Sequence, residues 1–206
     1  MRRFRSRSQR RSRLEIAAEK AFRASQAFTC QICARDILAS KGVIAHHGYE
    51  RPWHSHLQTA SCGGARALPF ECSNHELLKD SRQTSAAVVS QRRIVRALQR
   101  KDATISCEYQ DRTKPADARG RYPSVRVSFT ALTFAETVAA HRQMVRWCSP
   151  GDITFERFQS IEVAAAKQLL RMIEGHLTRQ QRRNANWKQT HAAVWADGKF
   201  VRFDKL

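Results

Sequence analysis

The chain has 206 residues, enough for one domain of moderate size or a small domain with appendages. Its 37 Lys and Arg against 18 Asp and Glu give a net charge of +19, which favours a polyanionic partner, nucleic acid before an anionic membrane surface. No apolar run approaches the roughly 18 residues of a membrane span, and none follows the basic start, so we expect neither a membrane protein nor a secretory signal. The expected location is the cytoplasm.

The first segment, residues 1–13, is rich in arginine and has no acidic residue. Almost nothing in it can be buried, which predicts a disordered arm. Its arginines are expected to pair with nucleic-acid phosphates through charge alone. They are Arg2, Arg3, Arg5, Arg7, Arg10, Arg11 and Arg13.

Residues 14–28 combine good helix formers with apolar residues at helical spacing, which predicts a helix leading into the first cysteine. The chain changes character over residues 28–72. There "GVIAHH" is typical of a short strand, and glycines and prolines divide the rest into turns. Such a segment cannot bury much apolar surface without help.

A helix is predicted over about 81–101, with an apolar side and a basic face formed by Arg92, Arg93 and Arg96. We expect this face to contact nucleic acid. Period-two alternation in "ATISCEYQDR" and "SVRVSFTAL", separated by a polar loop, predicts a hairpin. The stretch "TFAETVAAHRQMVRWC" is interpreted as a helix covering that hairpin.

The longest helix is predicted over about 153–188, with Asp152 or Thr154 as its N-cap. Its basic C-terminal part, which includes Arg183, is expected to project into solvent or onto a polyanion. The Asp-Gly step in "HAAVWADGKFVRF" predicts a second hairpin. Trp53 and Trp187 could stack on unpaired bases or serve as packing residues.

The cysteines raise the question of a metal. A reducing compartment disfavours disulfides and makes clustered thiols candidate metal ligands. Cys30 and Cys33 form a C-x-x-C pair, which supplies two thiolates from one turn; twelve residues later come His46 and His47, and fourteen after these comes Cys62. This spacing fits a Cys3His zinc site. Chance clustering and a redox-active C-x-x-C remain alternatives, although the redox motif needs a preceding strand and a βαβ pattern that is not visible.

The same segment resembles a family. "GVIAHHGYERP" followed by "LQTASCGGARALPFE" is similar to small, mostly uncharacterised zinc-finger-like proteins of phages, prophages and plasmids. These share a C-x-x-C, an HHGY-x-RP box and a TASC-x-GAR-x-LP box. The resemblance covers residues 28 to about 73. It implies that Cys30, Cys33, one histidine of the pair and Cys62 hold the metal, and it implies no established activity.

The resemblance further implies that five residues shape the loop around the metal: Tyr49, Arg51, Gly64, Arg66 and Pro69. This sequence departs from the family pattern between the boxes, where "WHSH" replaces an expected glycine-rich turn. His54 and His56 are therefore either an accessory metal site or exposed loop residues.

Together these patterns predict an α+β, mainly helical fold, in which long basic helices flank a small irregular zinc-clipped β module, with one or two short hairpins. The expected division is an arm at 1–13, a helix plus zinc-finger-like module at 14–80, and a helical region with hairpins at 81–206.

The favoured function is that of a zinc-binding, non-catalytic protein of a phage or other mobile element that binds DNA or RNA. The first alternative is an HNH-like metal-dependent nuclease with His47 as base, Asn74 as orienting residue and His75 as ligand. That assignment lacks the second C-x-x-C usual in such proteins and leaves Cys62 without a role. The second alternative is a virion or regulatory protein whose partner is another protein.

Overall fold

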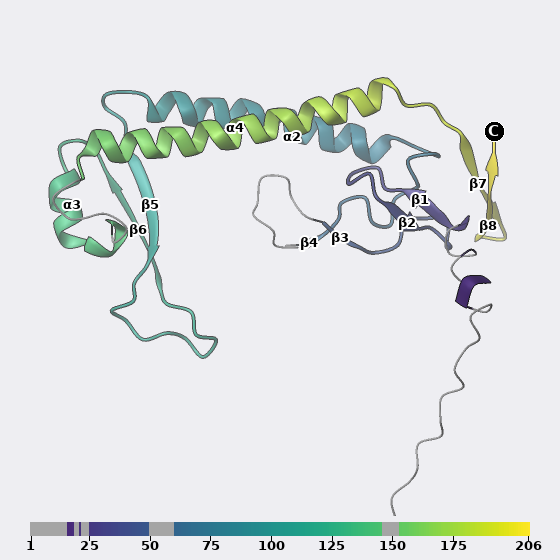
Figure 1. Cartoon of the computed structure of the whole chain (residues 1–206), viewed down its shortest axis with the longest axis horizontal. Coiled ribbons are helices and arrows are strands. Elements are labelled where there is room, and N and C mark those ends of the chain that lie inside the picture. The colour runs from purple at the N-terminus through teal and green to yellow at the C-terminus, as the bar shows by residue number, and fades with distance from the viewer. Residues whose placement is uncertain (1–15, 19–20, 22–24, 50–59, 146–152) are drawn as a thin grey trace, which may run out of the picture. The chain divides into compact units, whose positions relative to one another are not determined.

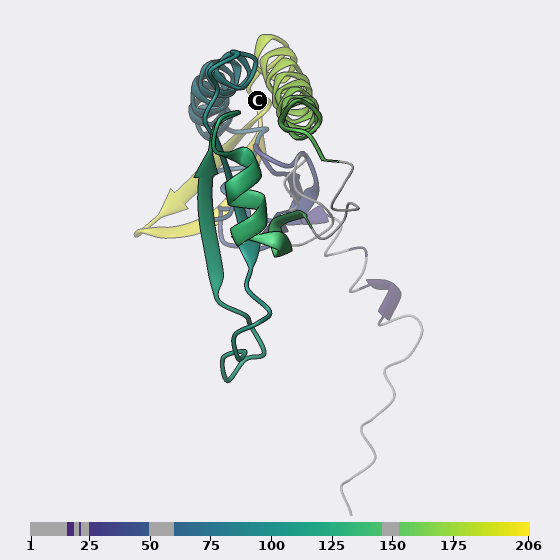
Figure 2. The same ribbon diagram turned by 90° about the vertical axis from the view of Figure 1, so that its left-hand side faces the viewer.

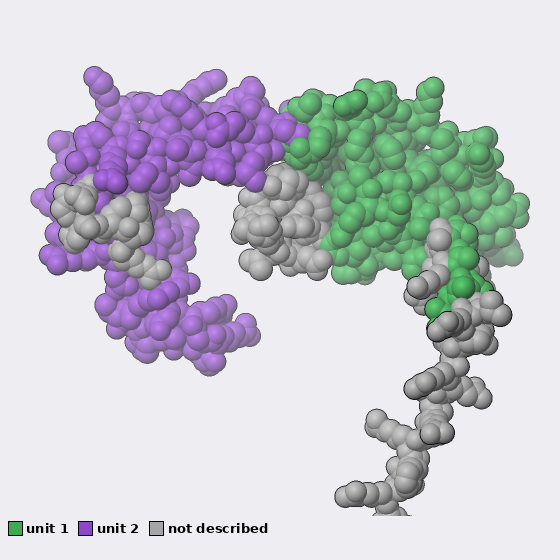
Figure 3. Space-filling view, in the orientation of Figure 1, with its two compact units in different colours: residues 1–83, 176–206 green, residues 84–175 purple. Residues whose placement is uncertain are grey.

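The structure is a computed structural model that describes residues 16–18, 21, 25–49, 60–145 and 153–206. The predicted arm, part of the predicted helix at 14–28, Arg51, and the "WHSH" segment lie outside the described residues. Within these residues the fold is α+β, as the sequence predicted, with helices and four two-stranded antiparallel sheets. The chain divides into two compact units, residues 1–83 with 176–206, and residues 84–175 (Figure 3).

The first unit contains Cys30, Cys33, Cys62 and Cys72 and three of the hairpins (Figure 1). The helix α2 begins in it and the helix α4 ends in it. Its strands pair β1 with β2, β3 with β4, and β7 with β8. The bounds are β1 Ala27–Thr29, β2 Asp36–Leu38, β3 Gly48–Tyr49, β4 Ala60–Ser61, α2 His75–Leu98, α4 Phe155–Ala185, β7 His191–Ala196 and β8 Lys199–Lys205.

The core of this unit joins the cysteine segment to the C-terminal hairpin. Buried Cys30, Ile32, Ala39, Ile44 and Cys62 form one cluster, and Phe28 and Phe203 pack against it. The rings of Phe28 and Phe203 lie 4.2 Å apart. The hairpin β7–β8 turns at the predicted Asp-Gly step, where both residues have positive φ, as a type I′ turn requires. A segment far along the chain thus covers the cysteine module, which cannot bury enough surface alone.

The second unit is built around the hairpin formed by β5 (Ile105–Gln110) and β6 (Ser124–Phe129). Figure 2 shows the helix α3 (Phe134–Ala140) beside this hairpin, followed by the 3-10 helix η1 (Arg142–Val145). The core consists of residues from the inner face of the hairpin, from α3 and η1, and from the start of α4. It comprises Ile105, Phe129, Phe134, Met144, Val145, Phe155 and Phe158.

Within this unit α2 and α4 contact each other through a partly polar seam. Buried residues of α2 recur at three- and four-residue steps at Thr84, Val88, Gln91 and Val95. The amide of Gln91 donates to the carbonyl of Ala166 over 3.1 Å. This spacing is typical of paired helices. None of the helices in the described residues has an apolar stretch long enough to cross a membrane.

Several predicted elements differ from the observed ones. Residues 43–47 are not a strand: Ile44 exchanges hydrogen bonds with residues 66 and 67, but pairing does not extend, and β3 starts only at Gly48. The predicted helix at 14–28 ends earlier than expected: residues 16–18, 21 and 25 are helical, and the strand β1 then leads into Cys30. The predicted helix after β6 is α-helical only to Ala140, then becomes η1.

Two further differences come from long-range contacts. The helix α2 begins at His75, earlier than expected, because the side-chain oxygen of Gln31 accepts the backbone N–H groups of Glu76 and Leu77. The two compact units differ from the expected division at 80/81, because residues 176–206 fall in the same unit as Cys30, Cys33 and Cys62. The helix α4 behaves as predicted at its start, where the Thr154 hydroxyl accepts the backbone N–H of Arg157 over 3.2 Å.

Candidate metal centre

The first two thiols are positioned by a tight turn after β1. The backbone N–H of Cys30 donates to the carbonyl of Arg35 over 2.9 Å, and the N–H of Ala34 donates back to the carbonyl of Cys30 over 3.1 Å. Ala34 has a φ of 60°, the left-handed conformation that such a turn requires and that glycine would adopt at lower cost. The turn, here called the knuckle (residues 30–34), places both thiols on one side.

The other two side chains come from the ends of the β3–β4 hairpin. Gly48 pairs with Ser61, and the next pair outward is His47 with Cys62. The N–H of Cys62 donates to the carbonyl of His47 over 2.9 Å, which continues the hairpin by one bond. Strand register therefore holds an imidazole and a thiol next to each other.

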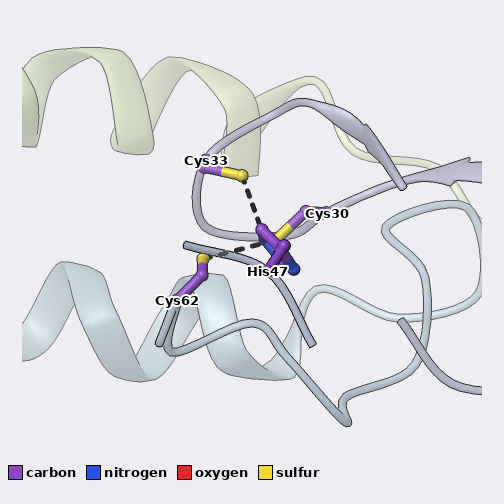
Figure 4. Close-up of side chains that lie close together, drawn as sticks. All are labelled: Cys30, Cys33, His47 and Cys62. Atoms are coloured by element: carbon purple, nitrogen blue, oxygen red, sulfur yellow. Dashed lines mark hydrogen bonds between the residues drawn. The ribbon is translucent and has the colours of Figure 1, made fainter. Parts of the chain in front are cut away.

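The four side chains converge on one point (Figure 4). The sulfur atoms of Cys30 and Cys62 lie 3.7 Å apart, and Cys33 Sγ lies 3.3 Å from His47 Nε2. No two ligand atoms of the group are more than 4.8 Å apart. A tetrahedral zinc with bonds of about 2.3 Å to sulfur and about 2.0 Å to nitrogen requires separations of about 3.5 to 3.8 Å. The donor set and its spacing fit such an ion.

These separations also exclude a disulfide between the two buried cysteines. A disulfide needs about 2.05 Å between the sulfur atoms, far less than the 3.7 Å between Cys30 and Cys62. Cys30, Cys33 and Cys62 are all free thiols. All three sulfur atoms are therefore available to a metal ion.

The tautomer of His47 is set by a backbone contact. Its Nδ1 lies 2.8 Å from the carbonyl oxygen of Ala45, which can only accept, so Nδ1 carries the proton. The other ring nitrogen, Nε2, then points into the group of thiols, 3.3 Å from Cys33 Sγ. A carbonyl behind the histidine is a common support for a metal-binding imidazole because it fixes the ring and raises its basicity.

The electrostatics of the group concentrate negative charge on one sulfur. Hydrogen bonds from the thiols of Cys30 and Cys62, and another from Arg35 Nε at 3.4 Å, lower the pKa of Cys33. Contacts with the thiols of Cys30 and Cys33, together with burial, raise the pKa of Cys62, and the contact between Cys30 and Cys33 raises the pKa of Cys30. A divalent cation would relieve this crowding of thiols, because a metal binds the thiolate form and its binding releases the thiol protons.

The structure distinguishes between the adjacent histidines. His46 is exposed to solvent, whereas His47 is half-buried and belongs to the group. Among the described residues, the group contains no other histidine or cysteine. Cys72 lies apart from it, and burial raises the pKa of its thiol to about 11, which is typical of an inert packing cysteine.

The box after Cys62 closes over the thiols. A Cβ atom added at Gly64 would lie 2.5 Å from Cys30 Sγ, so only glycine fits there. Pro69 is fully buried, and the carboxylate of Glu71 accepts the hydroxyl of Thr29 over 2.6 Å. Arg66 has a φ of 67°, and its N–H donates to the carbonyl of Ile44 over 2.8 Å. These contacts explain physically why the segment that follows Cys62 has glycine at position 64, proline at 69 and glutamate at 71.

Arg183, near the end of α4, supports the knuckle, although the sequence predicted that this part of the helix projects into solvent or onto a polyanion. Arg183 does not project into solvent: its guanidinium donates to the carbonyls of Gln31 at 2.8 Å and Cys30 at 3.2 Å. It also lies over the ring of Phe70, 4.6 Å from its centre. Desolvation lowers the pKa of this half-buried arginine. Only the folded structure reveals the role, since the arginine stands about 150 residues from the knuckle.

The expected nucleic-acid contacts are only partly described. The arm lies outside the described residues. On α2, Arg93 and Arg96 are exposed, whereas Arg92 pairs with Glu174 at 2.7 Å. The indole N–H of Trp187 donates to the carbonyl of Phe70 over 2.6 Å, so this tryptophan anchors the end of α4.

The residues of the alternative nuclease assignment have other contacts. The Asn74 amide donates to Asn184 Oδ1 over 3.2 Å. The side chain of His75 is 79% exposed and lies 3.3 Å from Glu76. His47 is engaged with the thiols, and neither Asn74 nor His75 joins it in the metal-binding group.

No family model, curated protein or solved structure matches this chain. A metal centre is therefore supported by the geometry of its four residues, which form a Cys3His cluster that could hold a metal ion such as zinc.

Proposed function

We propose that the protein is a zinc-binding, non-catalytic nucleic-acid-binding protein of a phage or other mobile element. The observation that carries the zinc part is the closed Cys3His group, in which protein side chains supply all four ligands. Structural zinc sites have four protein ligands, whereas catalytic sites keep one position for water. In this role Cys30, Cys33, His47 and Cys62 hold the ion, and the ion supplies folding energy to residues 28–72.

The need for such an ion follows from the size of the module. The buried cluster around the thiols contains few large apolar side chains and takes two of its buried members from the cysteines themselves. A small module of this kind gains a large part of its stability from a bound metal. The C-terminal hairpin, through Phe203, and Arg183 also stabilise the module.

The nucleic-acid part of the proposal is supported by charge. Arginine and lysine outnumber acidic residues in both units, and residues 84–175 alone carry fifteen against nine. The excess is therefore not confined to the arm, which has seven arginines. In this proposal the arm and the rest of the chain both contact phosphates. The protein acts in the cytoplasm. The resemblance to phage and plasmid proteins supports the assignment to a mobile element.

A salt titration tests the proposal. The full chain and a variant lacking residues 1–13 are titrated with one duplex and one single strand, and log affinity is plotted against log salt. The slope is about −0.9 per phosphate neutralised on duplex DNA, so losing three or four arm contacts should reduce it by roughly three units. Undetectable binding by both proteins at low salt would refute nucleic-acid binding. Mg²⁺-dependent nicking of plasmid that is lost in His47→Ala would favour the nuclease alternative.

A further inference from the structure

The hairpin β5–β6 has an outer face made only of polar side chains. Its inner face packs on the phenylalanine core of the second unit, while every second residue points to solvent. The outward residues of both strands are exposed and all of them can form hydrogen bonds. They are Ser106, Glu108 and Gln110 on β5, and Ser124, Arg126 and Ser128 on β6.

These six residues, here called the outer face, form three cross-strand pairs. Ser106 faces Ser128, Glu108 faces Arg126, and Gln110 faces Ser124. The hydroxyls of Ser106 and Ser128 lie 2.7 Å apart, and Arg126 Nη2 lies 3.0 Å from the carboxylate of Glu108. The Arg126 and Glu108 side chains are 75% and 51% exposed, so their ion pair is weak and can exchange for another partner.

The loop that joins the two strands brings positive charge to the end of this face. Residues 111–123 include Arg112, Lys114, Arg119 and Arg121, against two aspartates. Asp117 orders the tip: its carboxylate accepts the backbone N–H groups of Arg119 at 2.9 Å and Arg121 at 2.8 Å. Gly120, with a φ of 74°, completes the turn. The tip is thus a hydrogen-bonded turn that presents arginines.

We infer that the outer face of β5–β6 lies in the major groove of duplex DNA and contacts base edges, with the loop cations on the flanking phosphates. This inference rests on the proposed function and adds a partner and a reading surface to it. The major groove of B-form DNA admits a two-stranded ribbon, and arginine and glutamine are the side chains that bind guanine and adenine edges there. Arg126 and Gln110 supply one of each.

The choice of DNA follows from groove shape. The major groove of A-form RNA is too deep and narrow for side chains on a ribbon to read. An exposed polar face accompanied by a cationic loop complements a groove that is lined by hydrogen-bond donors and acceptors and bordered by phosphates. Among the described residues, the exposed arginines of α2, Arg93 and Arg96, carry charge but do not belong to a comparable set of cross-strand pairs.

The experiment starts with selection of preferred duplexes from a random pool by the full-length zinc-loaded protein. The ratio of affinities for a selected and a scrambled duplex is then measured for the wild type and for the double variant Gln110→Ala with Arg126→Ala. The matched control is Lys167→Ala with Gln168→Ala, which removes the same residue classes from exposed positions of α4 in the same unit. We expect the ratio to fall about tenfold or more in the first variant and to stay unchanged in the control.

Two more measurements locate the contact. Methylation of guanine N7, which lies in the major groove, should interfere with binding of the wild type and not of the Gln110/Arg126 variant. Affinity for a double-stranded RNA of the same sequence should be equal in the two proteins. If the wild type binds duplexes but selects no sequence, or if the variant keeps its selectivity, this inference is wrong while the proposed function stands. Failure to bind any nucleic acid at low salt would instead remove the proposed function.

Discussion

Replacing Arg183 by methionine tests how the end of α4 supports the knuckle. Methionine keeps much of the aliphatic volume against Phe70 but removes the guanidinium, which donates to the carbonyls of Gln31 and Cys30 at 2.8 and 3.2 Å. A hydrogen bond to a charged group contributes about 1.5–3 kcal/mol, and the freed carbonyls would lie in a partly buried place. Two such bonds, taken as less than additive, amount to about 3 kcal/mol.

The loss should appear in the affinity for zinc, because those carbonyls fix the turn that positions Cys30 and Cys33. At about 1.4 kcal/mol for each factor of ten, 3 kcal/mol corresponds to roughly a hundredfold weaker binding. The assay is a competition titration against a chromophoric chelator, with thermal unfolding measured in parallel. Arg182→Met is the matched control, since Arg182 is exposed on the same turn. Wild-type zinc affinity in Arg183→Met would refute the reasoning.

Three further substitutions follow from the structure. Gly64→Ala should weaken zinc binding strongly, because the new Cβ would lie 2.5 Å from Cys30 Sγ, whereas Gly63→Ala meets nothing within 4 Å and should bind normally; equal affinities in a chelator competition would contradict this. Burial raises the pKa of Glu162, so its ionised form destabilises the fold at neutral pH. Glu162→Gln should therefore raise the melting temperature at pH 7, with a gain that vanishes as pH falls below the ordinary glutamate pKa. Hydrogen bonds at the start of α4 lower the pKa of Glu156, so Glu156→Gln should lower the melting temperature at pH 7; a gain in both variants would count against the assignment.

The candidate metal ligands could be predicted from sequence because their signal is local. A C-x-x-C fixes two thiols on one turn. The histidine pair and Cys62 are separated by fourteen residues, a length that one hairpin can span. Spacing alone could not choose between His46 and His47. That choice depends on strand register, because the pair Gly48 with Ser61 places residue 47 opposite residue 62. A shift of one residue would direct His46 inward.

The hairpins β5–β6 and β7–β8 were predictable for the same reason. Period-two alternation located β5 and β6, and the Asp-Gly step located the turn between β7 and β8. The run "GVIAHH" gave a misleading signal, since its buried apolar side chain, Ile44, packs in the thiol cluster and not against a sheet. A cluster of β-branched residues favours a strand by composition. Here Ile44 forms hydrogen bonds only with residues 66 and 67, and these are too few to make a β-ladder.

The contacts that join distant segments could not be derived from sequence. Gln31 caps α2 from within the knuckle, and Arg183 binds the knuckle from the end of α4. Both side chains are polar, and Arg183 was expected in solvent or on a polyanion, yet each binds backbone groups close to the buried thiols. The basic composition at the end of α4 concealed this, because a single buried arginine has the same sequence signature as its exposed neighbours.

The central claim is that Cys30, Cys33, His47 and Cys62 bind one zinc ion, and native mass spectrometry of chelator-free protein tests it most directly. The wild type and His46→Ala should each show one zinc per chain, whereas Cys62→Ser and His47→Ala should lose it or release it to a chelator that leaves the wild type loaded. Zinc-free wild type, or equal retention of zinc in Cys62→Ser, would contradict the account.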